Sequence, residues 1–118
     1  MGYESRLYVV EESNFVFPSD NGKRFAEVIG MIDLCVCYEI RDVFDKDAEG
    51  YIYSDDGNTR IEIDCYGEPL KVASLKSVIV KLRKIVRETD YRRAKIALAF
   101  LESVYEVMPE CKVYHYGH

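Results

Sequence analysis

The chain has 118 residues, a size typical of one domain, and 48% of them are hydrophobic, enough to form a core. Its charged N-terminus lacks the apolar run of a signal peptide, and no apolar stretch is long enough to span a bilayer. We therefore expect a cytoplasmic protein with no membrane segment.

Charge divides the chain into segments of opposite sign. Residues 1–70 hold six Lys or Arg and sixteen Asp or Glu, a net charge of −10. Residues 71–95 hold nine and two, a net charge of +7, and residues 96–118 hold one and three, a net charge of −2. Such polarity steers encounters with charged partners. The charge pattern therefore favours a function in binding.

The first third of the chain has the composition of strands. Residues 6–12 are rich in β-branched and aromatic side chains. In residues 25–40 every even position is apolar or glycine, which predicts a strand with one face against a core. That run is too long for one regular strand, so we expect a bulge or break near Gly30 or Asp33.

Residues 51–66 predict a β-hairpin with Asp56 and Gly57 as its loop. This register would place Arg60 opposite Tyr53, where the two side chains can form a cation–π contact. It would also turn three isoleucines toward the core: Ile52, Ile61 and Ile63.

Two helices follow the hairpin. The first should begin after Ser74 as N-cap and end near Glu88, with apolar residues on one side and basic residues on the other. The second should run from about Tyr91 to Val107, with Thr89 or Asp90 as its cap.

A last strand is predicted for residues 111–116, after the two helices. The order of elements predicts an α+β fold in a single domain over residues 1–118. We expect an antiparallel sheet of about four to five strands packed against a C-terminal pair of helices.

The basic residues of the helices are the first candidate binding site. The candidate contacts are Arg83, Arg87, Arg92 and Arg93. Nothing in the sequence supplies base recognition, and an acidic protein is repelled by nucleic acid, so among possible partners an acidic protein is favoured over nucleic acid. Two alternatives stay open: a solvated helix face, and a homo-oligomer in which the basic helix meets the acidic part of another copy.

The acidic hairpin is the second candidate site. Its candidate contacts are Tyr51, Tyr53, Asp55, Asp56 and Glu62. Acidic residues that share one surface could imitate a nucleic-acid backbone and occupy the groove of a nuclease, although they also serve solubility. The segment from Asp55 to Asn58 lacks the alternating ligands and distant glutamate of a calcium-binding EF-hand loop.

The sequence offers little for catalysis. Glu62 and Asp64 would share one face of a strand, about 7 Å apart, and a small hydrolase using this pair is the alternative to a binding protein. No phosphate-binding glycine loop or nucleophile motif is present. We therefore expect a non-enzyme with no cofactor and no metal. The four cysteines match no zinc module and are expected to be reduced thiols in packing roles: Cys35, Cys37, Cys65 and Cys111.

Two stretches carry a resemblance to a known group. GYESRLYVV (residues 2–10) and YIYSDDGNTRIEIDCYGEPL (residues 51–70), followed by Tyr91-Arg92-Arg93, resemble small phage and prophage proteins of Gram-positive bacteria. The group has no assigned catalytic residues that could be carried over. The resemblance implies an accessory protein that acts inside an infected bacterial cell. Proteins of this kind bind and divert host factors, including defence nucleases.

Overall fold

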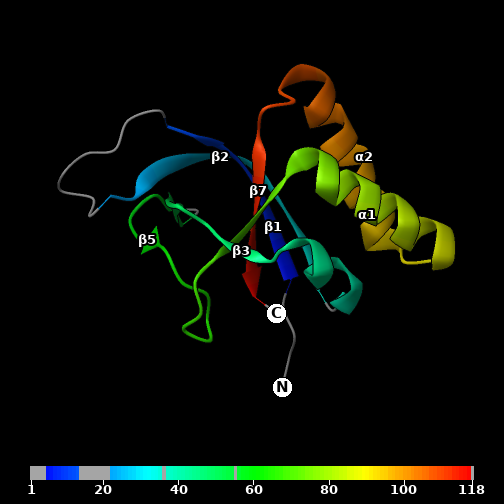
Figure 1. Ribbon diagram of the computed structural model, residues 1–118, viewed down its shortest axis with the longest axis horizontal. Helices are drawn as coiled ribbons and strands as arrows, with labels where there is room; N and C mark the ends of the chain where they lie inside the picture. Colours follow the sequence, from blue (N-terminus) through cyan, green and yellow to red (C-terminus); the bar gives the residue numbers. More distant parts are fainter. Residues whose placement is uncertain (1–4, 14–21, 36, 55, 118) are drawn as a thin grey trace.

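The structure, a computed structural model, describes residues 5–13, 22–35, 37–54 and 56–117. It is an α+β fold in which a curled seven-stranded sheet carries two helices, and its extents are 45 × 37 × 26 Å (Figure 1). None of the helices in the described ranges is both long and apolar enough to cross a membrane.

The elements follow in chain order. They are β1 (Ser5–Glu12), β2 (Arg24–Cys35), the 3-10 helix η2 (Tyr38–Val43), β3 (Lys46–Asp47), β4 (Gly50–Tyr53), β5 (Arg60–Ile61), β6 (Lys71–Ser74), α1 (Leu75–Glu88), α2 (Arg92–Val107) and β7 (Lys112–Gly117).

The spatial order of the strands is β3-β6-β7-β1-β2-β4-β5. Strand β7 therefore lies inside the sheet, between β6 and β1, although it comes last in the chain. Every strand pair is antiparallel except β2 with β4, which is parallel. The α+β class is confirmed, whereas the predicted purely antiparallel sheet of four to five strands is wrong. The helices also do not close the chain as a C-terminal pair, because β7 follows them.

The sheet curls until its two ends meet at residues 62–70. The backbone N–H of Ala48 donates to the carbonyl of Leu70 at 2.7 Å, and the N–H of Leu70 donates to the carbonyl of Glu62 at 3.3 Å. An isolated bridge joins Ile63 and Pro69. These contacts connect the β5 end of the sheet to the β6 end, so the sheet acquires an inner and an outer face.

Each face of the sheet packs its own core. In β1, Leu7 and Val9 face the helices, while Tyr8 and Val10 face the inside of the curl. We call the first set the helix-side core; its buried members include Leu7, Val9, Leu34, Val78, Leu82, Ala97, Leu101 and Val113. The inner core consists of Tyr8, Val10, Ala26, Ala48, Ile52, Leu70 and Tyr114.

A bulge in β2 lets this one strand contribute to both cores. Val9 pairs with Gly30 but the next residue, Val10, pairs with Val28, so Ile29 is an extra residue. The predicted bulge near Gly30 is confirmed. The apolar even positions therefore pack into different cores. Ala26 and Val28, before the bulge, pack into the inner core, and Ile32 and Leu34, after it, pack into the helix-side core.

The first helix matches its prediction. Ser74 is the N-cap of α1, and its hydroxyl accepts from the backbone N–H of Ser77 at 3.2 Å. The helix ends at Glu88, and its buried residues recur at helical spacing: Leu75, Val78, Ile79, Leu82 and Ile85.

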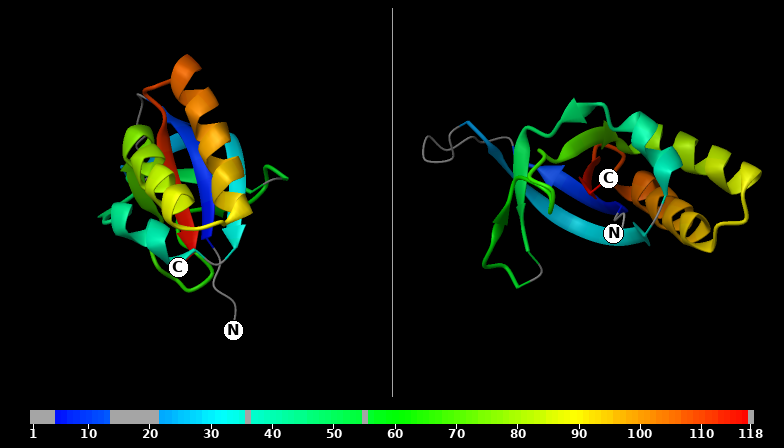
Figure 2. Two further views of the ribbon diagram at one scale, coloured as in Figure 1. Left: turned by 90° about the vertical axis from the view of Figure 1, so that its right-hand side faces the viewer. Right: turned by 90° about the horizontal axis from the view of Figure 1, so that it is seen from below.

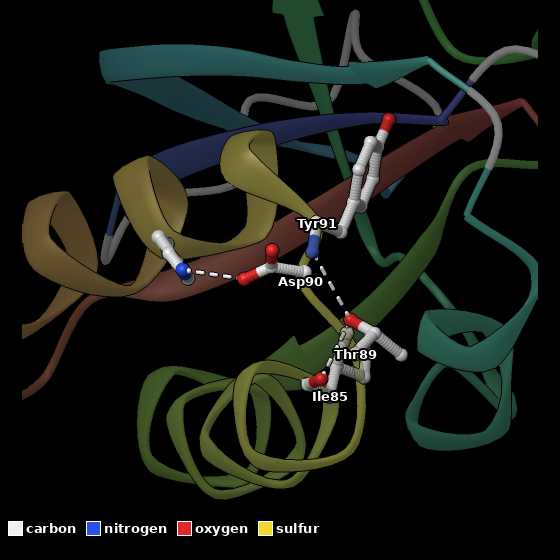
Figure 3. A network of polar contacts seen from close by, with 5 residues as sticks. Ile85, Thr89, Asp90 and Tyr91 are labelled. Carbon is white, nitrogen blue, oxygen red and sulfur yellow. Dashed lines mark hydrogen bonds and ion pairs between the residues drawn. The ribbon is translucent and has the colours of Figure 1, made fainter.

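The turn between the helices differs from its prediction. The N-cap of α2 is Tyr91, with no side-chain cap bond, so neither Thr89 nor Asp90 caps it. The Thr89 hydroxyl instead donates to the carbonyl of Ile85 at 2.8 Å and accepts from the N–H of Tyr91 at 3.3 Å (Figure 3). Asp90 pairs with Lys95 at 3.0 Å. Thr89 thus closes the end of α1 and fixes the chain that leads into α2.

Candidate functional site

The two groups of predicted contact residues lie at opposite ends of the molecule. Helices α1 and α2 lie side by side at one end, and the hairpin formed by β4 and β5 lies at the other (Figures 1 and 2). The structure therefore does not bring the basic and acidic candidates together. It presents two separate surfaces of opposite charge.

A groove of about 240 Å³ runs between α1 and α2. We call it the helical groove; its lining includes Lys76, Val80, Arg83, Glu102, Tyr105 and Glu106. Val80 is 55% exposed and Tyr105 39% exposed. Apolar and aromatic surface is thus open to solvent beside charged side chains of both signs.

The four predicted arginines are all exposed, but they have different surroundings. Arg83 lines the helical groove and pairs with Glu102 at 3.0 Å. Arg93 donates to the backbone carbonyl of Asp33 at 2.8 Å, which ties the start of α2 to the end of β2. Arg87 and Arg92 make no ion pair or hydrogen bond with any residue that the structure describes. These two are therefore available to a partner without loss of an internal contact.

The predicted register of the hairpin is confirmed, since Ile52 pairs with Ile61 and Tyr53 with Arg60. The predicted cation–π contact with Tyr53 is wrong. The Arg60 guanidinium lies instead over the ring of Tyr51, 3.7 Å from its centroid. A long side chain can reach diagonally across a strand pair, so the opposed backbone position does not decide its contact. Ile63, expected in the core, is 54% exposed.

Three aromatic rings cluster on the outer face at this end of the sheet. Phe25 lies 5.9 Å from Tyr51 and 5.8 Å from Tyr53 between ring centroids, and the two tyrosines are 5.8 Å apart, edge to face. Sequence reasoning missed Phe25, which joins the cluster because β2 and β4 are parallel neighbours with Phe25 opposite Tyr51.

The acidic candidates of the hairpin are held by local bonds. Asp56 accepts from the Ser54 hydroxyl and from the N–H of Asn58 at 3.0 Å, and these bonds lower the pKa of its carboxyl. Glu62 pairs with Arg60 at 3.2 Å. Asp55 lies outside the described residues.

A pocket of about 460 Å³ at the meeting point of η2, β6, β7 and residues 64–69 has no counterpart in the sequence prediction. Buried His115 lines it, stacks on Phe44 with ring centroids 4.8 Å apart, and shares a hydrogen bond of 3.0 Å with the Ser5 hydroxyl. Ser5 itself is fully buried, so this pair anchors β1 to β7 and is not exposed as a nucleophile.

The two carboxylates proposed for hydrolysis have different neighbours. Asp64 is buried, lines the His115 pocket, and accepts from the N–H groups of Tyr66 and Glu68 at 2.8 and 3.0 Å. Glu62 pairs with Arg60 on the outer face and does not line that pocket. The carboxylate of Asp64 therefore stabilises its own turn.

The four cysteines are free thiols. Burial raises the pKa of Cys37 and of Cys111, which keeps both in the unreactive neutral form at neutral pH. No group of three or more His, Cys, Asp and Glu side chains in the described ranges is arranged to hold a metal ion.

Comparisons with known protein families, with curated proteins and with solved structures find no match. The function has to be argued from the surfaces themselves.

Proposed function

We propose that the protein is a non-enzymatic binding protein that occupies an acidic surface of a macromolecular partner with its helical groove. The observation that carries this proposal is the exposure of Val80 and Tyr105 beside Arg83 in one groove between two helices. Tyrosine and arginine at the centre of a patch supply most of the energy in many protein interfaces.

The surrounding charges define the partner's chemistry. Arg87 and Arg92 are exposed and free of internal ion pairs with described residues, so they can steer an acidic partner toward the helices. Glu102 and Glu106 line the same groove. Their carboxylates would repel a continuous phosphate backbone, whereas a protein can place apolar surface in the groove and its acidic groups beside Arg87 and Arg92.

The resemblance to phage proteins gives this proposal a specific form. The partner would be a protein of the bacterial host, and stoichiometric occupation of its surface would block it. Inhibition of a host defence factor is the version that we propose, because the resemblance implies an accessory protein that binds and diverts host factors of this kind.

The test compares two double charge reversals that change the net charge equally. Arg87→Glu with Arg92→Glu alters the helices, whereas Lys23→Glu with Lys46→Glu alters residues of the sheet region and serves as the control. We expect the first variant to lose a partner captured from host lysate and the control to retain it, with a 1:1 complex of the purified partner in sedimentation.

Equal capture by both variants would remove the steering of an acidic partner by Arg87 and Arg92 from the proposal. A mobility shift of DNA or RNA at low salt, abolished by the Arg87 and Arg92 reversals, would instead establish a nucleic-acid-binding protein.

A further inference from the structure

The opposite end of the molecule carries a second built surface, on the outer face of β2, β4 and β5. Side chains alternate between the two faces along a strand, and this shows which residues belong to the surface. Ala26, Ile52 and Ile61 pack toward the inner core, so their sequence neighbours point outward. This end of the sheet extends beyond the part that α1 and α2 cover (Figure 2). We call this surface the aromatic face; it consists of Phe25, Glu27, Tyr51, Tyr53 and Asp56.

One ring of the aromatic face already holds a guanidinium. Arg60 lies over Tyr51, and Glu62 fixes it with contacts of 3.2 Å to Nε and 3.3 Å to Nη2. The guanidinium is thus held over the tyrosine ring and paired at its edge with a carboxylate, on the outside of a sheet. With Phe25 and Tyr53 at its sides, Tyr51 is only 5% exposed.

The neighbouring ring has the same chemistry and is open. Tyr53 is 41% exposed, and it contacts Tyr51 and Phe25, but no cation among the described residues lies over its face. An exposed tyrosine beside a guanidinium stack offers a second position where a cation is attracted by the ring and packed by its neighbours.

Two acidic residues belong to the same end of the sheet as this ring. Glu27 is exposed and follows Phe25 by two residues, so its side chain leaves the sheet on the same face. Asp56 lies in the loop that follows Tyr53, and hydrogen bonds from Ser54 and Asn58 hold the pKa of its carboxyl below the usual range. The charge around Tyr53 therefore complements a cation and opposes a phosphate.

We propose that the aromatic face docks a basic segment of a protein partner, with an arginine side chain stacked on Tyr53 and its charge facing Glu27. The incoming arginine lies over the ring of Tyr53 in the same way that Arg60 lies over the ring of Tyr51. This surface is separate from the helical groove, so the failure of either proposal leaves the other standing.

The experiment uses the full chain and a defined probe, an end-blocked eight-residue peptide of alternating arginine and glycine. Titration by calorimetry gives the affinity, and amide shifts in NMR spectra locate the site. We expect shifts at residues 24–28 and 50–62. A peptide with citrulline in place of arginine, which has similar shape and no charge, should not bind.

Two substitutions of Tyr53 distinguish a contribution of its ring to binding from an effect on folding. Tyr53→Leu should weaken binding about two- to fivefold, the size of an exposed cation–π contact, whereas Tyr53→Phe keeps a ring and should stay within about twofold of the parent. Tyr38→Leu is the matched control, because Tyr38 has a similar exposure, 49%, but lies in the 3-10 helix η2, outside both proposed surfaces. It should leave peptide affinity unchanged.

Three results would overturn the proposal. The first is equal affinity of Tyr53→Leu and the parent while both give folded spectra. The second is equal binding of the citrulline peptide. The third is a concentration-dependent dimer that Tyr53→Leu disrupts, since a second copy would then be the occupant of the aromatic face.

Discussion

At Gly50 the sheet leaves no room for a side chain. A Cβ at this position would lie 2.8 Å from the backbone carbonyl oxygen of Arg24 and would also overlap the hydroxyl of Tyr114. Gly50 pairs with Arg24 where β4 joins β2, so the missing side chain permits the parallel contact of these strands. The hydroxyl of Tyr114 donates to Glu12 on β1, within the same crowded end of the inner core.

Gly50→Ala should therefore lower the free energy of unfolding by about 1–3 kcal/mol, the usual cost of overfilling a packed site. Urea denaturation measures this change. Gly30→Ala is the control, because its Cβ would meet only the ring of Phe100, a side chain that can be shortened.

The double variants discriminate between the two sites. Phe100→Leu should recover much of the loss in Gly30→Ala. Tyr114→Phe should not rescue Gly50→Ala, since the backbone oxygen of Arg24 remains. Wild-type stability of Gly50→Ala would contradict the close approach of β2 and β4.

Single residues also show how far sequence reasoning extends at the candidate sites. The register of Tyr53 with Arg60 was predictable because the Asp56-Gly57 loop fixes the count of residues between the strands. The position of the Arg60 side chain over Tyr51 was not, since several rotatable bonds separate it from the backbone. The pairing of Ser5 with His115 joins residues 110 positions apart, and no local pattern signals it.

At the scale of elements, α1 is the most locally determined part of the chain. Its apolar residues recur at helical spacing, and Ser74 supplies the cap, so propensity and packing agree. Strands β3 and β6 are the opposite case. They contain two and four residues, too few to show alternation, and they exist because β7 and the 62–70 turn bring their partners alongside.

The cap of α1 gives a prediction at this scale. Ser74→Ala should lower the free energy of unfolding by about 1 kcal/mol, because the N–H of Ser77 loses its acceptor. Ser103→Ala makes the same chemical change within α2, where the hydroxyl only donates back to the carbonyl of Ala99. It should cost nothing or stabilise slightly in thermal unfolding. Equal losses in both variants would show that Ser74 contributes no cap.

At the scale of the whole molecule, the sheet depends on its last strand. β7 pairs with β1 on one side and β6 on the other, and it places Val113 in the helix-side core and Tyr114 in the inner core. The sequence predicted this strand but not its central place, because strand order depends on contacts between distant segments that no local pattern specifies.

A chain ending at Glu110 should therefore fail to fold. Each core loses a buried side chain of the central strand, and β1 and β6 each lose one neighbouring strand. Circular dichroism and amide NMR spectra measure the loss. Adding a peptide of residues 111–117 should restore dispersed amide signals. A truncated chain that folds without the peptide would place β7 at the periphery instead.

The distribution of charge also becomes clear only at this scale. The acidic and basic segments of the sequence could have faced each other across one core, and the order of residues does not decide between that arrangement and separation. The structure separates them, with helices α1 and α2 at one end and the hairpin of β4 and β5 at the other (Figure 1). Under the two proposals, one molecule holds two partners of opposite charge at once.

Ile29 is an extra residue in β2 that has no partner of its own in β1. One unbroken run of alternating apolar residues packs into two different cores. The alternation of side chains between the two faces of the sheet shifts by one residue at Ile29. Deleting Ile29 would remove the bulge without changing which core either side of it faces, because Val28 and Gly30 would become consecutive partners of Val10 and Val9. A deletion elsewhere in β2 should be tolerated less well, because the residues between that position and Ile29 would turn to the wrong face.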